Sequence, residues 1–127
     1  MTYFTARTIE ADFDAVLERT RAALQKHGFG VLTEIDVQAT LKTKIDVDFR
    51  PYRILGACNP VMAHDALKME PHVGVMLPCN VVVQQTEGGV EVFAVDPAAS
   101  MSAIDNPDLL RHAQTVGEHL AAAVAEI

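Results

Sequence analysis

The sequence has no tryptophan, only two cysteines and few positive charges, and these shortages exclude several classes of protein. Its 10 lysines and arginines stand against 17 aspartates and glutamates, a formal net charge of −7 at pH 7. A surface of that sign repels phosphate backbones and anionic lipid headgroups, so we expect no nucleic-acid partner and no membrane partner. Two cysteines are also too few for a disulfide-stabilised scaffold.

Long hydrophobic runs are missing as well. The longest run, 73–83, is interrupted by Pro78, Cys79 and Asn80, and it is too short to span a bilayer. Residues 1–7 lack the basic start and apolar stretch of a secretory signal. We therefore expect a cytoplasmic protein whose two cysteines are free thiols.

What the chain does have is apolar content. Half of its 127 residues are hydrophobic, which is enough for one buried core and excludes general disorder. No internal repeat, low-complexity tract or linker marks a boundary. The sequence therefore predicts a single domain over residues 1–127.

The first quarter of the chain predicts a strand followed by a helix. Residues 3–9 alternate weakly, and apolar residues at helical spacing then indicate a helix over about 13–27. Asp12 suits the N-cap of that helix, and Gly28 suits a left-handed residue at its end.

A second strand and a short helix follow. The alternation over 29–35 predicts a strand with three residues on one face, namely Phe29, Val31 and Ile35. Asp36 is the predicted N-cap of a short helix with three inward-facing apolar residues, Val37, Leu41 and Ile45.

The middle of the chain predicts a strand over 52–58 and then a helix. Asn59-Pro60 is a strong helix start, because the asparagine oxygen accepts an orphan amide and proline has no amide to satisfy. We expect that helix to run from Pro60 to about Glu70, where Pro71 ends it.

The last third predicts a β-hairpin and a terminal helix. Residues 73–86 and 90–96 flank a glycine turn, with the first strand split at Pro78. A short helical piece is expected at 97–101, and Asn106-Pro107 starts a final helix with an apolar stripe. This order favours an α+β fold with a mainly antiparallel sheet and helices packed on one face.

Three segments, 28–37, 52–60 and 77–83, resemble the DUF302 family and occur in that family's order. The resemblance extends over roughly residues 13–97. It implies an α+β fold of the β-α-β(4)-α type with short helical insertions. It also implies a small bacterial or archaeal protein that forms a homodimer, and it implies no established activity.

The candidate site residues lie at two corners where a cysteine precedes an asparagine: Cys58 with Asn59, and Cys79 with Asn80. Cys58 comes directly before a predicted helix, whose N-terminal amides can lower a thiol pKa or bind an anion. The simpler interpretation is that both cysteines are small buried hydrophobic residues.

If both thiols face one pocket, three kinds of chemistry are open. They are a redox dithiol, a soft-metal or haem ligand pair, and a nucleophile with His64 as its base. The two cysteines are 21 residues apart, so the Cys-x-x-Cys signature of zinc and thioredoxin sites is absent. His64 lies one turn into the predicted helix. A lone histidine on a helix is more often a solvated residue than a functional one.

The remaining polar residues have structural explanations too. Asn59 is accounted for by N-capping, whereas Asn80 interrupts a run of β-branched residues and needs hydrogen-bond partners or a pocket. His72, just before the predicted hairpin, is a weaker ligand candidate than His64. His112 and His119 have no neighbouring residue that completes a ligand set, and we expect no metal.

Nucleotide-binding and common hydrolase motifs are absent from the sequence. The leading hypothesis is a homodimer that binds a small ligand or an unidentified cofactor near five residues, Cys58, Asn59, His64, Cys79 and Asn80. The alternatives are a thiol-dependent enzyme or redox protein using Cys58 with His64, and a structural or interaction protein without a site. The sequence does not decide whether the protein is an enzyme.

Overall fold

The computed structural model describes residues 2–127. Five strands form one sheet in the order β1-β5-β4-β3-β2, and every neighbouring pair is antiparallel. The strands are β1 (Phe4–Ile9), β2 (Gly30–Asp36), β3 (Tyr52–Cys58), β4 (Cys79–Thr86) and β5 (Gly89–Val95). The predicted α+β fold with an antiparallel sheet is confirmed.

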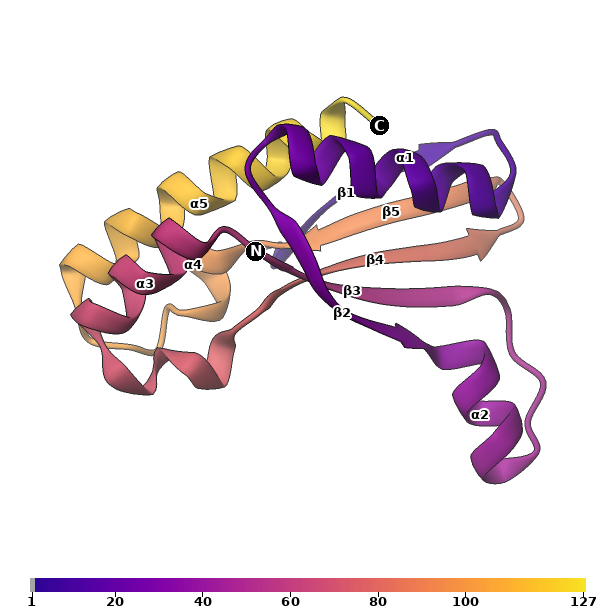
Figure 1. The fold of residues 1–127 in the computed structure, drawn as a ribbon, viewed down its shortest axis with the longest axis horizontal. Coiled ribbons are helices and arrows are strands. Elements are labelled where there is room, and N and C mark those ends of the chain that lie inside the picture. Colours follow the sequence, from indigo (N-terminus) through magenta and orange to yellow (C-terminus); the bar gives the residue numbers. More distant parts are fainter. Residues whose placement is uncertain (1) are drawn as a thin grey trace.

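The helices cover one face of the sheet and both of its ends (Figure 1). They are α1 (Phe13–Lys26), α2 (Val37–Ile45), α3 (Pro60–Met69), the 3₁₀ helix η1 (Pro71–Met76), α4 (Pro97–Ser100) and α5 (Pro107–Ala125). Helices α1 and α5 contact each other and the same face of the sheet. Helices α3 and α4 gather at one end of the sheet, whereas α2 projects from the other end. No helix within residues 2–127 is long and apolar enough to cross a bilayer.

Short polar side chains start the helices, as the sequence predicts. The Asp36 carboxylate accepts the Ala39 amide at 2.9 Å, and the Asn59 amide oxygen accepts the Met62 amide at 3.1 Å. Each such cap satisfies one orphan N–H and stabilises its helix by about 1 kcal/mol. The end of α1 also follows prediction, because Gly28 has φ +87° and the Phe29 amide donates to the Leu24 carbonyl at 2.8 Å.

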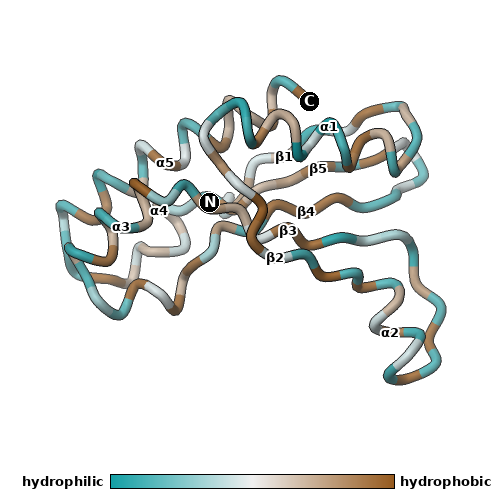
Figure 2. Tube along the Cα trace, in the orientation of Figure 1, coloured by the Kyte–Doolittle hydropathy of each residue, from teal (hydrophilic) through white to brown (hydrophobic). Residues whose placement is uncertain are grey.

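The main core lies between the sheet and the α1–α5 layer. Figure 2 shows hydrophobic segments along the central strands, while the helices alternate between hydrophobic and hydrophilic turns. This alternation lets each helix bury one stripe of its surface. The side chains that are entirely enclosed include Val16, Val81, Val83, Val90, Val92 and Leu120.

The predicted face of Ile35 is wrong, because β2 contains a bulge. Val31 pairs with Ala57 and Thr33 pairs with Gly56, so Leu32 is an extra residue on β2. One extra residue reverses the alternation of all that follow. Ile35 therefore lies on the opposite face from Val31 and is 50% exposed.

The inward orientation predicted for Val37, Leu41 and Ile45 is also wrong. No residue of α2 is buried, and the Ile45 side chain is 62% exposed. The helix projects beyond the sheet from the ends of β2 and β3, so no second layer is present to cover it (Figure 1).

A third correction concerns residues 71–76, which form η1 where a strand is predicted. The Glu70 carboxylate accepts the His72 amide and holds the start of this turn. Val73 is fully buried in a second cluster beside Ala66, Leu109 and Ala113. Local hydrogen bonding and this tertiary contact outweigh the β-preference of Val73 and Val75.

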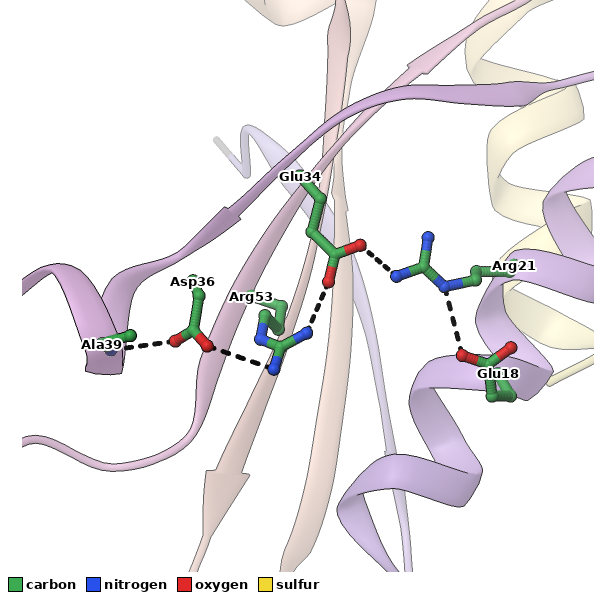
Figure 3. Close-up of polar contacts among 6 residues, drawn as sticks. All are labelled: Glu18, Arg21, Glu34, Asp36, Ala39 and Arg53. Carbon is green, nitrogen blue, oxygen red and sulfur yellow. Dashed lines mark hydrogen bonds and ion pairs between the residues drawn. The ribbon is translucent and has the colours of Figure 1, made fainter.

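An ion-pair network joins α1 to the β2–β3 pair (Figure 3). The Glu34 carboxylate lies between the guanidinium groups of Arg21 and Arg53, and Arg53 also contacts Asp36 at 3.1 Å. The hydrogen bond from Arg21, followed by that from Arg53, lowers the pKa of Glu34 below its ordinary value. Glu34 therefore stabilises the folded chain in its ionised form.

We expect Glu34→Gln to lower the free energy of unfolding at pH 7 by about 0.5–1 kcal/mol, the range of partly exposed ion pairs. Because the folded-state pKa is depressed, the contribution is complete above the ordinary value of 4.5 and disappears as pH falls through the folded-state value. Urea unfolding at pH 7 and at acidic pH measures this difference. The matched control is Glu87→Gln in the exposed hairpin turn. An equal loss at both pH values contradicts the assignment.

Candidate functional site

A cavity of about 30 Å³ lies on the helix-covered side of the sheet, at the end opposite α2. It lies where β3 ends and β4 begins, and residues of α3 and α5 form the rest of its lining. Its wall is mainly apolar and includes Phe29, Ala57, Met62, Ala63, Ala66, Leu77, Met101, Ala113 and Val116.

Both cysteines line this cavity. Ala57 on β3 pairs directly with Cys79 on β4, so Cys58 is displaced from Cys79 by a single residue along the strand. Cys79 is 7% exposed and Cys58 is partly exposed, and both are free thiols. Burial, followed by the negative charge of nearby Cys58, raises the pKa of the Cys79 thiol to about 11.

Two glycines allow the backbone to close around this region. A side chain at Gly56 would place its Cβ 2.1 Å from Thr33 Oγ1 and 2.7 Å from Pro78 Cγ. A Cβ at Gly28 would lie 2.9 Å from Asn59 Nδ2. The end of α1 thus packs against the start of α3, and Pro78 packs against β3 directly before Cys79.

Asn59 has two roles in the structure. Its side chain caps α3, and the residue also lines the cavity beside Cys58. Its amide oxygen is occupied by the Met62 amide at 3.1 Å. Asn59 therefore organises the helix start at the cavity wall.

His112 and Met62 were not among the residues selected from the sequence, yet both line the cavity. His112 Nε2 lies 2.8 Å from the Met62 carbonyl oxygen and joins α5 to α3. A carbonyl oxygen only accepts hydrogen bonds, so Nε2 carries the proton and Nδ1 of the neutral ring keeps its lone pair. The available signal was the position of His112 directly before Ala113 in the apolar stripe of α5.

Two residues selected from the sequence lie elsewhere. His64 is exposed and does not line the cavity. Asn80 pairs with Gly56 and is exposed on the opposite face of the sheet from Cys79, because successive strand residues alternate. His72, also exposed, contacts Glu70.

The donor atoms around the cavity differ from those of common metal centres. Within the described chain, residues 2–127, no group of three or more histidine, cysteine or acidic residues is arranged to hold a metal ion. The cavity instead combines two thiols with thioethers and one imidazole in an apolar wall. Such a site can bind a small, soft or apolar species that gains by leaving water.

Comparisons with known proteins agree with this architecture. A family model described as "Domain of unknown function DUF302" matches residues 5–127. A solved structure described as an uncharacterized conserved protein DUF302 from Bacillus stearothermophilus is 29% identical, with a TM-score of 0.93. The match covers 99% of this chain and 98% of that chain. No curated protein matches the sequence.

We expect Cys79 to react with iodoacetamide at least about 100-fold more slowly in the native protein than in the urea-unfolded chain. Raising its pKa from 9.0 to about 11 reduces the thiolate fraction by about that factor, and burial adds a steric barrier. Peptide mass spectrometry after timed alkylation at pH 8 measures both cysteines, with Cys58 reacting first. Equal rates for Cys79 in the native and unfolded states contradict the assigned burial.

Proposed function

The chain belongs to the DUF302 family, whose description assigns no function, and from this premise we propose that it is a homodimer that binds a small ligand. The ligand site is the cavity between α3, α5 and the adjoining ends of β3 and β4. The proposal includes a cytoplasmic location, where reducing conditions keep Cys58 and Cys79 as free thiols.

One observation carries the ligand site: two cysteines from separate strands line a single cavity with an apolar wall. Protein interiors are close-packed and contain few voids as large as a water molecule. A void bordered by both thiols and a histidine is therefore a feature that a purely structural core does not need.

The size of the cavity limits the ligand. A volume of about 30 Å³ is far below the roughly 300–1,000 Å³ of sites for drug-sized molecules. The ligand is accordingly an ion or a molecule of a few atoms, unless the wall moves. Helix α3 is the wall best suited to move, because Ala66 is its only buried residue.

The environment of the thiols favours binding over thiol catalysis. The Cys79 thiol, with its pKa of about 11, is protonated throughout the neutral range and is a poor nucleophile. His64 is exposed away from the cavity, and His112 Nε2 is occupied by the Met62 carbonyl.

We expect Ala63→Leu to abolish ligand retention, because the added carbons occupy the cavity from α3. Native mass spectrometry of freshly purified protein should show a retained mass in the wild type and none in this variant. Ala122→Leu, the same change at an exposed position of α5, is the control and should retain the mass. Thermal unfolding of all three proteins checks that each is folded. Equal retention by both variants argues against the cavity, as does a wild type without retained mass and without saturable xenon-induced NMR shifts.

The homodimer is supported by the face of the sheet opposite the α1–α5 layer. Within the described chain, no helix packs across that face (Figure 1). The strand register aligns one apolar row across all five strands, composed of Ile35, Ile54, Val82, Phe93 and Ala6. Phe93 also contacts the Phe4 ring, with centroids 5.8 Å apart, and the Tyr52 ring at 6.5 Å. We call this surface the open face.

The area of the open face indicates how a second copy binds. Five strands about 4.8 Å apart, each of six to eight residues rising about 3.3 Å, form a surface of roughly 500 Å². Stable interfaces bury about 800 Å² on each partner, so the sheet alone is too small. The arm formed by residues 37–51 supplies further apolar surface, since Ile45 is 62% and Val47 is 41% exposed. We propose that the open face and the arm together receive a second copy of this chain.

We expect the wild type to sediment as a dimer and Ile35→Lys to shift it toward monomer, since a lysine in the interface is desolvated without a partner. The 50% exposure of Ile35 in the single chain keeps the cost to folding small. Val75→Lys places the same charge on η1, where the side chain is 85% exposed, and should leave the dimer unchanged. Analytical ultracentrifugation over a range of protein concentrations tests this. A monomeric wild type, or equal dimerisation of both variants, contradicts the assigned interface.

A further inference from the structure

A continuous chain of aromatic rings, which we call the aromatic ridge, crosses the open face. Neighbouring ring centroids lie 5.1 Å apart for Tyr3 and Phe4, 5.8 Å for Phe4 and Phe93, 6.5 Å for Phe93 and Tyr52, and 6.0 Å for Tyr52 and Phe49. Five of the seven tyrosine and phenylalanine residues of the chain belong to it. Aromatic residues are enriched in protein interfaces because each ring buries a large apolar area.

The aromatic ridge runs diagonally over the sheet. Phe49 lies in the arm, which joins β2 to β3 at the end of the sheet where β3 begins. Phe4 starts β1 and pairs with Val95 at the end of β5, so it lies at the opposite end of the sheet. Strand β1 is also the edge strand on the far side from β2. The ridge therefore connects the arm with the diagonally opposite corner of the sheet.

An open hollow of about 510 Å³, which we call the β1 hollow, lies at that corner. Phe4 of the ridge lines it, together with Gly117 and Ala121 from α5. Asp96 and Glu118 add two acidic residues to its wall. The β1 hollow is therefore suited to apolar side chains that have a positive charge beside them.

The arm holds its shape through its own contacts. The Gln38 side-chain amide donates to the Phe49 carbonyl at 2.9 Å, and Lys42 contacts Asp46 at 2.9 Å and Asp48 at 3.2 Å. A helix of nine residues is marginal in water by itself, and no residue of α2 is buried. Burial against another surface therefore stabilises the arm, and a preformed arm loses little conformational entropy on binding.

The arm also differs from the rest of the chain in charge. It has three basic residues, Lys42, Lys44 and Arg50, and two acidic residues, Asp46 and Asp48. The rest of the chain has seven basic and fifteen acidic residues, so the arm has a net charge of +1 and the rest of −8. An arm is therefore repelled by a second arm and attracted to the acidic wall of the β1 hollow.

We infer that the two copies of the homodimer exchange arms, so that Ile45 and Val47 of each arm bind at the β1 hollow of the other copy. The inference deepens the proposed homodimer and rests on it. Ile45 is 62% and Val47 is 41% exposed in the single chain. Lys44, directly before Ile45, brings a positive charge to the acidic wall.

Two-fold symmetry allows this arrangement. Two open faces that meet are related by a two-fold axis that lies between them. When the axis runs across the aromatic ridge, the arm end of one ridge lies over the β1 end of the other. When it runs along the ridge, each arm meets the other arm. The charges favour the first arrangement, and exchange adds the arm and the β1 hollow to an open face that alone is too small for a stable interface.

The test mixes two variants of the full-length chain, each altered at one of the two surfaces. Ile45→Glu places a charge on the arm, and Ala121→Lys places one in the β1 hollow. A homodimer of either variant has both arm–hollow contacts altered, so we expect its dissociation constant to rise at least about tenfold. Sedimentation velocity over a range of protein concentrations measures this rise.

The mixed dimer is expected to recover. One of its contacts joins an unaltered arm to an unaltered hollow, and the other brings the two substitutions together as opposite charges. We expect mixed dimers at a protein concentration at which each variant alone is monomeric. Native mass spectrometry identifies the mixed dimer by its mass.

Matched controls place the same charges elsewhere. Val61→Glu alters a side chain that is 71% exposed on α3, and Ala122→Lys alters the exposed residue that follows Ala121 on α5. Both should dimerise like the wild type. Thermal unfolding of all variants checks that each is folded.

If arms meet arms, both the arm contact and the corner contact of the mixed dimer contain one altered copy, and mixing gives no recovery. An absence of mixed dimers, or wild-type dimerisation of either variant alone, overturns the exchange of arms. In that case a wild-type dimer that Ile35→Lys weakens still supports the homodimer on the open face. A monomeric wild type contradicts both proposals.

Discussion

The close approach of three strands at Gly56 is the constraint on which the candidate site depends. Gly56 pairs with Thr33 on β2 and with Asn80 on β4, and Pro78 packs against it. A side chain at this position would collide with Thr33 and Pro78, which lie 2.1 Å and 2.7 Å from the expected Cβ. This approach sets the register that places Ala57 opposite Cys79. Both cysteines line one cavity, and that register leaves them a single residue apart along the two strands.

The same sheet separates two kinds of surface. The cavity lies on the side covered by helices, where β3 ends, and the arm of residues 37–51 projects from the end where β3 begins. The apolar row of the open face lies on the other side of the sheet. The proposed ligand site and the proposed dimer interface therefore lie on different sides of the sheet.

Much of the fold was predictable because its signals are local. The capping residues Asp12, Asp36 and Asn59 and the glycine after α1 act within one helical turn, and all four were assigned correctly. Three predictions failed where a distant partner decides the outcome. The bulge at Leu32 reverses the face of Ile35, α2 has no layer to pack against, and Val73 is drawn into a cluster with α5. In each case the deciding factor is pairing or packing with another element of the fold, which the segment's own residues do not reveal.

The amino-acid sequence by itself determined the helix starts, the hairpin, the antiparallel α+β class and the family resemblance, because each depends on neighbouring residues or on recognisable segments. It also selected both cysteines. Only the tertiary structure decided which residues share the cavity with them. His112 contacts Met62 across 50 positions of the chain, and Asn80 is turned away from Cys79 by the alternation of a paired strand. The physical reason is that strand register and helix packing determine which residues are neighbours in space. A local pattern of residues does not specify either of them.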